Sequence, residues 1–274
     1  MGSIILTELF KLRKRPMTWW MLGIMAAVTT LVFTINYQIG KHSSSAKTAA
    51  TSLHRVLLPN GVHTAVSAAT ALWGTLIVIA IAVVVGNEFQ YGTIRTQLAM
   101  GIRRIPYIIG KAVAVFLAGL IGLAVIIAFG IGLSVILTAV EGAPMAWGGA
   151  FDQAFWQGIG AELLGVAPRF ALALVITLLA RQVVAGVAVV LGYTILEGTI
   201  TSILAGFGGG WAKAVNFFIT PNQRAIAYGL DRTQTFNKSL LQPPVAIALL
   251  AGYAIIFLVI SAVIFNRRDV KGAA

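Results

Sequence analysis

Residues 86–111 read GNEFQYGTIRTQLAMGIRRIPYIIGK, and this polar, basic segment separates two long apolar runs. The flanking residues 65–85 and 112–140 contain no Asp, Glu, Lys or Arg. Each run is long enough to cross the hydrocarbon core of a bilayer as a helix. A charged segment between two such crossings has to lie outside the hydrocarbon, because burying an unpaired charge there is too costly. The sequence therefore predicts that residues 87–106 form a cytoplasmic loop that contacts a partner.

This loop is predicted to contain a short helix. Asn87 or Glu88 is expected to cap its start, where a negative charge suits the helix dipole. Gly92 allows a tight bend, and Pro106 is expected to end the helix before the next span. The basic residues of the segment mark the cytoplasmic side of the membrane: Arg95, Arg103, Arg104 and Lys111.

The composition of the whole chain predicts an all-α polytopic membrane protein. Of its 274 residues, 58% are hydrophobic and only 10% are charged, whereas ordinary soluble domains carry about 25% charged residues. A soluble fold has no way to hide so much apolar surface. The net charge of +12 is attributed to membrane topology and anionic lipid headgroups, so nucleic acid is not expected as a partner. The absence of cysteine excludes disulfides, thiolate metal sites and a cysteine nucleophile.

The chain is predicted to be a single transmembrane domain over residues 1–274. The six predicted membrane spans are residues 19–39, 64–85, 107–140, 158–180, 183–207 and 245–265. The spacing of apolar residues predicts an amphipathic interfacial helix over residues 3–15, for which a plain positive-inside anchor is the alternative. Residues 208–244 are predicted to be an external segment with short amphipathic helices. The distribution of Lys and Arg places both termini in the cytoplasm.

Three charged residues lie inside the fourth and fifth predicted spans. Glu162 and Arg169 are in the fourth span and Glu197 is in the fifth. At a rise of 1.5 Å per residue, Arg169 and Glu197 both lie about 18–23 Å from the short inner turn between these spans, so we predict a salt bridge between them. An intramembrane ion pair marks a functional site by default, and a structural pair that fixes helix register is the alternative.

No motif for catalysis is present in the sequence. It lacks the phosphate-binding loop Gly-x-x-x-x-Gly-Lys-Ser/Thr, the metalloprotease motif His-Glu-x-x-His and the hydrolase motif Gly-x-Ser-x-Gly. His42, His54 and His63 share the predicted outer loop at residues 40–63, but their spacing fits no metal site. We therefore expect no catalytic residue, no metal and no cofactor in this chain.

The motifs around the loop resemble a known family. Residues 88–95 read EFQYGTIR, and they are followed by Leu98-Ala99, Arg103-Arg104 and Gly110-Lys111. In this order and spacing they are similar to the first cytoplasmic loop of permease subunits of the ABC type-2 exporter class. The motif ELFKLRKRP at residues 8–16 resembles the elbow helix of that family, and FNRRD at residues 265–269 resembles its terminal basic motif. The resemblance covers essentially the whole chain in topology.

This resemblance implies a permease that works with a separate ATPase. Two permease subunits, identical or related, would form the translocation pathway, and a dimer of cytosolic ATPase subunits with ATP and Mg would bind below them. The implied coupling residues are Glu88 and Gly92 at the junction, Thr93, Arg95 and Gln97 at the contact with the ATPase, and Arg103 and Arg104.

The same resemblance implies a pathway lined mainly by spans 1, 2 and 5 and closed outside by residues 208–244. It implies a multi-pass protein of the bacterial plasma membrane that contacts membrane lipids. The mostly apolar lining predicts an amphipathic or hydrophobic cargo, such as a lipid, a drug or a peptide.

Two other functions are compatible with the sequence. One is an accessory, immunity or sensing subunit that keeps the permease fold without moving a substrate. The other is a polytopic membrane enzyme acting on lipid, for which Glu162, Arg169 and Glu197 are the polar set within the spans. Transport would favour the permease, and activity of the chain without an ATPase would favour the enzyme.

Overall fold

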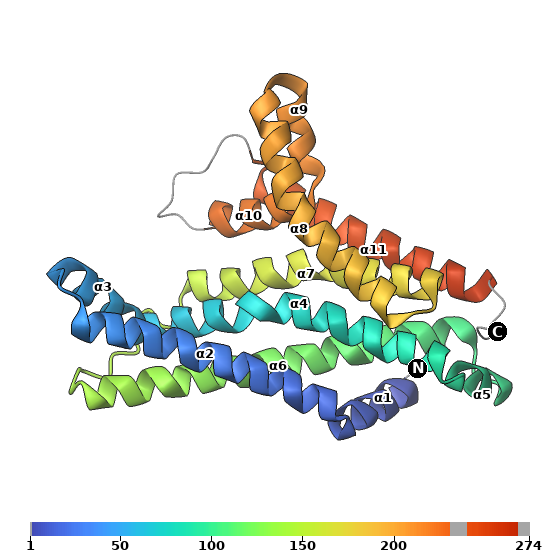
Figure 1. The fold of residues 1–274 in the computed structure, drawn as a ribbon, viewed down its shortest axis with the longest axis horizontal. Coiled ribbons are helices and arrows are strands. Elements are labelled where there is room, and N and C mark those ends of the chain that lie inside the picture. Colours follow the sequence, from blue (N-terminus) through green and yellow to red (C-terminus); the bar gives the residue numbers. More distant parts are fainter. Residues whose placement is uncertain (1, 231–239, 268–274) are drawn as a thin grey trace. The chain divides into compact units, whose positions relative to one another are not determined.

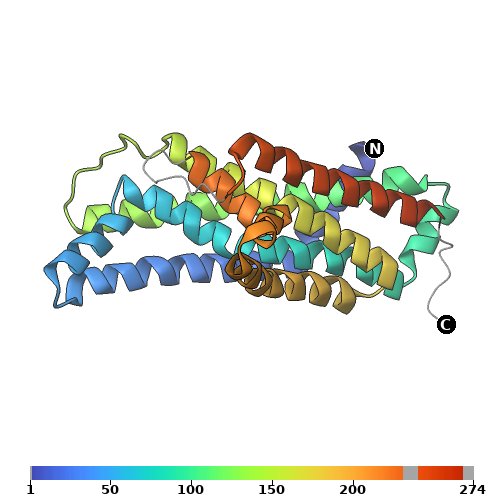
Figure 2. The ribbon, with the colours of Figure 1, turned by 90° about the horizontal axis from the view of Figure 1, so that it is seen from above.

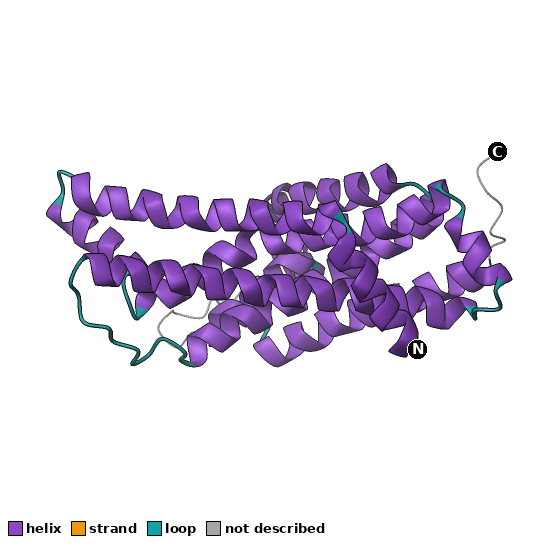
Figure 3. Ribbon diagram, turned by 90° about the horizontal axis from the view of Figure 1, so that it is seen from below, coloured by secondary structure: helices purple, strands orange, loops and turns teal. Residues whose placement is uncertain are grey.

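The computed structural model describes residues 2–230 and 240–267, and the regular elements of this part are all helices (Figure 3). The long helices are α2 (Pro16–His42), α4 (Asn60–Gln90), α6 (Arg104–Val140), α7 (Gln153–Ala180), α8 (Val183–Phe207) and α11 (Pro243–Arg267). The shorter ones are α1 (Gly2–Lys14), α3 (Ala46–Val56), α5 (Thr93–Ala99), α9 (Gly209–Ala214), η1 (Val215–Phe217) and α10 (Ile219–Leu230) (Figure 1). Residues 231–239 and 268–274, which include parts of the predicted external segment and of the terminal basic motif, lie outside the described residues.

The six long helices are each long and apolar enough to cross a membrane. Each of the six predicted spans lies within one of them. The longest, α6, has 37 residues; at 1.5 Å per residue it measures about 55 Å, well beyond a hydrocarbon core of about 30 Å. The prediction of an all-α polytopic membrane protein is thus confirmed.

The predicted outer loop at residues 40–63 contains a helix that the sequence reading missed. Helix α3 folds back on α2, with Ser52 and Val56 on its buried face. Gly40 permits this close approach, because a Cβ at that position would lie 2.5 Å from Leu53 Cγ. The sequence predicted only a loop here, but the buried face of α3 supplies the packing that such a short helix needs.

The helix limits around the predicted coupling loop differ from expectation. Asn87 and Glu88 are not helix caps, because α4 continues to Gln90 and includes both. Helix α5 ends at Ala99 and is followed by Gly101 with a φ of 84°, so Pro106 does not end it. Instead Pro106 lies in the first turn of α6, where a missing N–H costs no intrahelical hydrogen bond. The bend predicted at Gly92 is confirmed by its φ of 68°.

The chain divides into two compact units, each made of discontinuous segments. Unit 1 comprises residues 1–10, 75–116 and 160–274, and unit 2 comprises residues 11–74 and 117–159. In unit 1 the chain leaves α8, turns through α9 and η1 and returns as α10 (Figure 1). Helix α10 packs against α11 (Figure 2). A hydrophobic core joins α7, α10 and α11 through Ala161, Ile219, Ala225, Ile226, Ala246 and Leu250.

Unit 2 packs α2, α3, α4 and α6 around Phe33, Val56 and Ala65. At the ends of α2 and α6, Lys41 Nζ and the Tyr37 hydroxyl donate to the two oxygens of Glu141, both at 2.7 Å. These three residues form a partly exposed charge cluster.

Candidate functional site

Helix α5 is a short helix with a mostly polar exposed surface at the junction of two spans. Of its seven residues only Ile94 is buried. Thr93 and Arg95 are exposed, and Gln97 is half-buried. Gly92 adopts the αL conformation and turns the chain out of α4 into this helix. Glycine adopts this conformation at little cost. The three residues predicted to contact the ATPase therefore lie on one small, accessible element.

The base of this loop is braced by a cluster of buried charges, the Lys111 cluster, which consists of Glu8, Glu88, Tyr107 and Lys111. Lys111 Nζ lies 2.6 Å from Glu88 Oε1 and 2.7 Å from Glu8 Oε2, and its side chain has no exposed surface. The Tyr107 hydroxyl donates to the other Glu88 oxygen at 2.7 Å. The cluster joins α1, the end of α4 and the start of α6.

Sequence reasoning found Glu88 but not its partners. In the sequence Lys111 marks the cytoplasmic side, and Glu8 is the first residue of the motif that resembles the elbow helix. One signal was available: Tyr107 and Lys111 are four residues apart, so they share a helix face. The long-range partners Glu8 and Glu88 could not be assigned to that face without the packing of α1.

The two arginines that close the loop lie in different environments. Arg103 is exposed, whereas Arg104 is half-buried and donates from Nη1 to the carbonyl of Asn266 at 3.1 Å. The Tyr107 ring stacks on Phe265, with 6.2 Å between the ring centroids. The start of α6 is therefore attached to the end of α11 as well as to α4 and α1.

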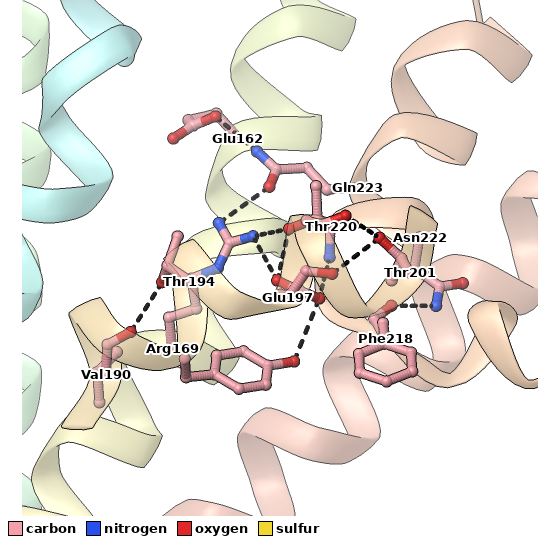
Figure 4. Close-up of polar contacts among 12 residues, drawn as sticks. Glu162, Arg169, Val190, Thr194, Glu197, Thr201, Phe218, Thr220, Asn222 and Gln223 are labelled. Atoms are coloured by element: carbon pink, nitrogen blue, oxygen red, sulfur yellow. Dashed lines mark hydrogen bonds and ion pairs between the residues drawn. The ribbon is translucent and has the colours of Figure 1, made fainter. Parts of the chain in front are cut away.

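A second buried polar group of unit 1 is shown in Figure 4. Arg169 Nη2 lies 3.7 Å from Glu197 Oε2, so the structure brings the two predicted partners together. Thr220 sits between them, because its hydroxyl accepts from Arg169 Nη2 at 2.8 Å and donates to Glu197 Oε2 at 2.6 Å. The Thr220 backbone N–H also donates to Glu197 Oε1 at 2.7 Å. The fully buried Glu197 side chain thus caps the start of α10.

Gln223 extends this group to a third charged residue. Its amide nitrogen donates to Glu162 Oε2 at 2.7 Å, and its amide oxygen accepts from Arg169 Nη1 at 3.1 Å. We name the five residues Glu162, Arg169, Glu197, Thr220 and Gln223 the Arg169 network. It holds α10 against α7 and α8. No sequence signal marked Thr220 and Gln223, because both are neutral and lie in the predicted external segment rather than in a predicted span.

The polar groups of both sites are engaged mainly with one another. This arrangement orients the helices that carry these residues. Among residues 2–230 and 240–267, no three or more His, Cys, Asp and Glu side chains come together as a metal site. His63 Nε2 lies 3.6 Å from Asp152 Oδ1, and His54 contacts Asn60.

Six helices long and apolar enough to cross a membrane, with the short helix α5 between the second and third, are those of a multi-pass membrane protein. The chain belongs to the ABC-2 family of transporter proteins, because the family model described as "ABC-2 family transporter protein" matches residues 4–270. A comparison with curated proteins gives no match. The resemblance seen in the motifs is therefore confirmed, and membership in this family implies partnership with an ABC ATPase subunit.

Proposed function

We propose that this chain is the membrane-spanning permease subunit of an ATP-driven ABC exporter and that α5 is its coupling helix. One observation carries this proposal: α5 is accessible, and the helix ends on either side of it are held together by the Lys111 cluster. A short helix can transmit a load only if its ends are attached firmly. The buried ion contacts of Glu88 supply such an attachment where α4 meets the loop.

The proposed cycle assigns a separate role to each part of the chain. ATP and Mg, bound by the partner ATPase, supply the energy when the ATPase dimer closes. Thr93, Arg95 and Gln97 of α5 receive the displacement, and Arg103 adds a positive charge beside them. Glu88 passes the displacement from α4 to α6 through Tyr107 and Lys111, and Arg104 passes it from α6 to α11 through Asn266.

The pathway is proposed to form between two permease subunits, identical or related. Large apolar side chains of α2 and α8 are exposed in the single chain, among them Trp20, Leu31, Ile195 and Ile203. A second subunit and membrane lipids would cover these faces, because water is a poor environment for them. An apolar pathway fits an amphipathic or hydrophobic cargo such as a lipid, a drug or a peptide.

The proposed setting is the bacterial plasma membrane, with both termini in the cytoplasm. Helix α1 ends with Lys11, Arg13 and Lys14, and the loop after α5 carries Arg103 and Arg104. The positive-inside rule then places α1 and α5 on the cytoplasmic face, where a cytosolic ATPase can reach them.

Partner-dependent ATP turnover in membrane vesicles tests this proposal. Gln97→Pro removes a helical N–H in the middle of α5, and Arg103→Glu reverses an exposed charge. We expect each change to reduce ATP turnover of the complex toward that of the ATPase alone. Thr51→Pro is the control, because it breaks another short helix, α3, at an exposed position.

Normal turnover in both α5 variants would contradict the coupling role. Equal loss in the α3 control would show that any broken short helix has the same effect, and it would also contradict a specific role for α5. Arg103 is preferred to Arg104 for this test, because Arg104 also contacts Asn266.

A further inference from the structure

We infer that Glu8 and Lys111 are positioning residues that fasten α1 to the base of α5, so that α1, the end of α4 and the start of α6 move as one body when the ATPase acts. This inference rests on the proposed function. It assigns to the elbow helix a role in transmission through a named ion contact, beyond that of an interfacial anchor.

The burial of the Lys111 ammonium is the first observation. Its side chain has 0% exposure, and the side chains of Glu8 and Glu88 have 4% and 9%. A buried lysine is costly unless it is paired and hydrogen-bonded. Here one ammonium contacts carboxylates from two different helices, so a single residue of α6 joins α1 to α4.

Close packing between α1 and α6 is the second observation. A Cβ placed on Gly110, the neighbour of Lys111, would lie 3.1 Å from Ile4 Cγ2 and 3.5 Å from Ile4 Cβ. The two helices therefore touch beside the ion contact. The absence of a side chain at Gly110 lets α1 come near enough for Glu8 to reach Lys111.

The small buried area of α5 is the third observation. Because Ile94 is its one buried residue, a displacement of α5 passes to the chain on either side of it. On one side this is Glu88, and on the other it is the start of α6 with Tyr107 and Lys111. Both routes end at the ammonium that Glu8 contacts, so α1 must follow the movement or resist it.

Two substitutions at Glu8 test this role in the complex with the ATPase. The variants are Glu8→Gln, which keeps the shape, and Glu8→Asp, which shortens the reach to Lys111. Glu141→Gln is the matched control, because it removes a carboxylate 2.7 Å from a lysine in unit 2. Two properties are measured for each: co-purification of the ATPase, and the MgATP-dependent change in maleimide labelling of a cysteine at the exposed position Phe217.

We expect both Glu8 variants to bind the ATPase and to show a nucleotide-dependent change in labelling about tenfold smaller than that of the wild type, because Gln has no charge to pair with the Lys111 ammonium and the shorter Asp no longer reaches it. The control should keep both properties. Loss of ATPase binding together with the response would show a structural role and overturn the inference. An unchanged response in both Glu8 variants would also overturn it. A wild-type complex that fails to bind an ATPase, or that shows no response, contradicts the proposed function instead.

A covalent bond can replace the ion contact. The chain has no cysteine, and the Cβ separation of 3.5 Å between position 4 and a side chain at position 110 lies within the range of disulfides. In Glu8→Gln, the pair Ile4→Cys and Gly110→Cys should restore the labelling response when oxidised and lose it again on reduction. An oxidised pair that forms fully and restores nothing would overturn the inference.

Discussion

The two buried polar groups of unit 1 attach helices in different ways. In the Lys111 cluster an ammonium contacts two carboxylates directly, at 2.6 and 2.7 Å, and joins three helices around the base of α5. In the Arg169 network the charged groups are 3.7 Å apart, and Thr220 and Gln223 mediate between them. The first group connects long helices to the candidate coupling helix, and the second positions the short helix α10.

This difference determines what remains when one residue is removed. If Lys111 is removed, the buried carboxylates of Glu8 and Glu88 lose the ammonium that lies between them. Without Arg169, Glu197 still accepts from the hydroxyl and the backbone N–H of Thr220. Where ion contacts are direct, the loss of one residue, Lys111, therefore removes them all. Where neutral residues such as Thr220 mediate, the stabilising contacts are shared among several residues.

The largest effect is expected for Lys111→Met. This change should destabilise the protein by about 3–5 kcal/mol, because it breaks a buried ion contact and leaves its partners charged and buried. Unfolding of the detergent-solubilised protein measures the loss, with Lys47→Met at an exposed position of α3 as the control. A loss no larger than that of the control would mean that the cluster does not brace the loop.

The next effect concerns the packing at the start of the coupling segment. A Cβ on Gly86 would lie 2.8 Å from the backbone nitrogen of Val183 and 2.9 Å from its Cα. Since backbone cannot rotate away as a side chain does, Gly86→Ala should cost about 1–3 kcal/mol. Gly192→Ala on α8, where nothing lies within 4 Å of the added atom, should be neutral or slightly stabilising. Equal stability of the two variants would contradict close packing of α4 on α8.

A smaller effect is expected within the Arg169 network. In a double-mutant cycle of Arg169→Ala and Glu197→Ala, we expect an interaction free energy of about 0.5–2 kcal/mol, because Thr220 compensates in part. Strictly additive losses would show that the two charges do not interact. A value as large as that of Lys111→Met would remove the contrast between direct and mediated contacts.

The smallest effect is expected for the exposed cluster of unit 2. The hydrogen bonds from Lys41 and then Tyr37 lower the pKa of Glu141 below its ordinary value of 4.5. A carboxyl whose pKa is lowered by folding stabilises the protein above that ordinary value and loses the contribution as pH falls through the folded pKa. Stability should therefore decline slightly less below pH 4.5 in Glu141→Gln than in the wild type. Identical pH profiles would contradict the contact.

The sequence was sufficient for the features that depend on local pattern. Six apolar runs predicted the six long helices, and Gly92 predicted the bend before α5. Arg169 and Glu197 stood out because each interrupts an apolar span. Each of these signals can be recognised within a single short stretch of the chain.

Features that depend on packing could not be predicted in the same way. Lys111 looks like an ordinary basic residue at the end of a span, and its burial depends on how α1 approaches Gly110. Helix α3 has a polar composition and depends on Gly40 of α2 for its position. Thr220 carries no charge, so nothing in the sequence indicated that it would lie between two ionised residues.

Crosslinking from α5 is the most direct test of the central claim, which is that α5 couples this permease to an ATPase. Single cysteines at Gln97 and, as the control, at Ser44 are crosslinked in native membranes before the chain is purified. We predict a nucleotide-sensitive crosslink from position 97, and none from position 44, to a cytosolic chain of the size of an ATPase. Recovery of the position 97 variant without such a partner would contradict the coupling role and favour an accessory subunit or a membrane enzyme.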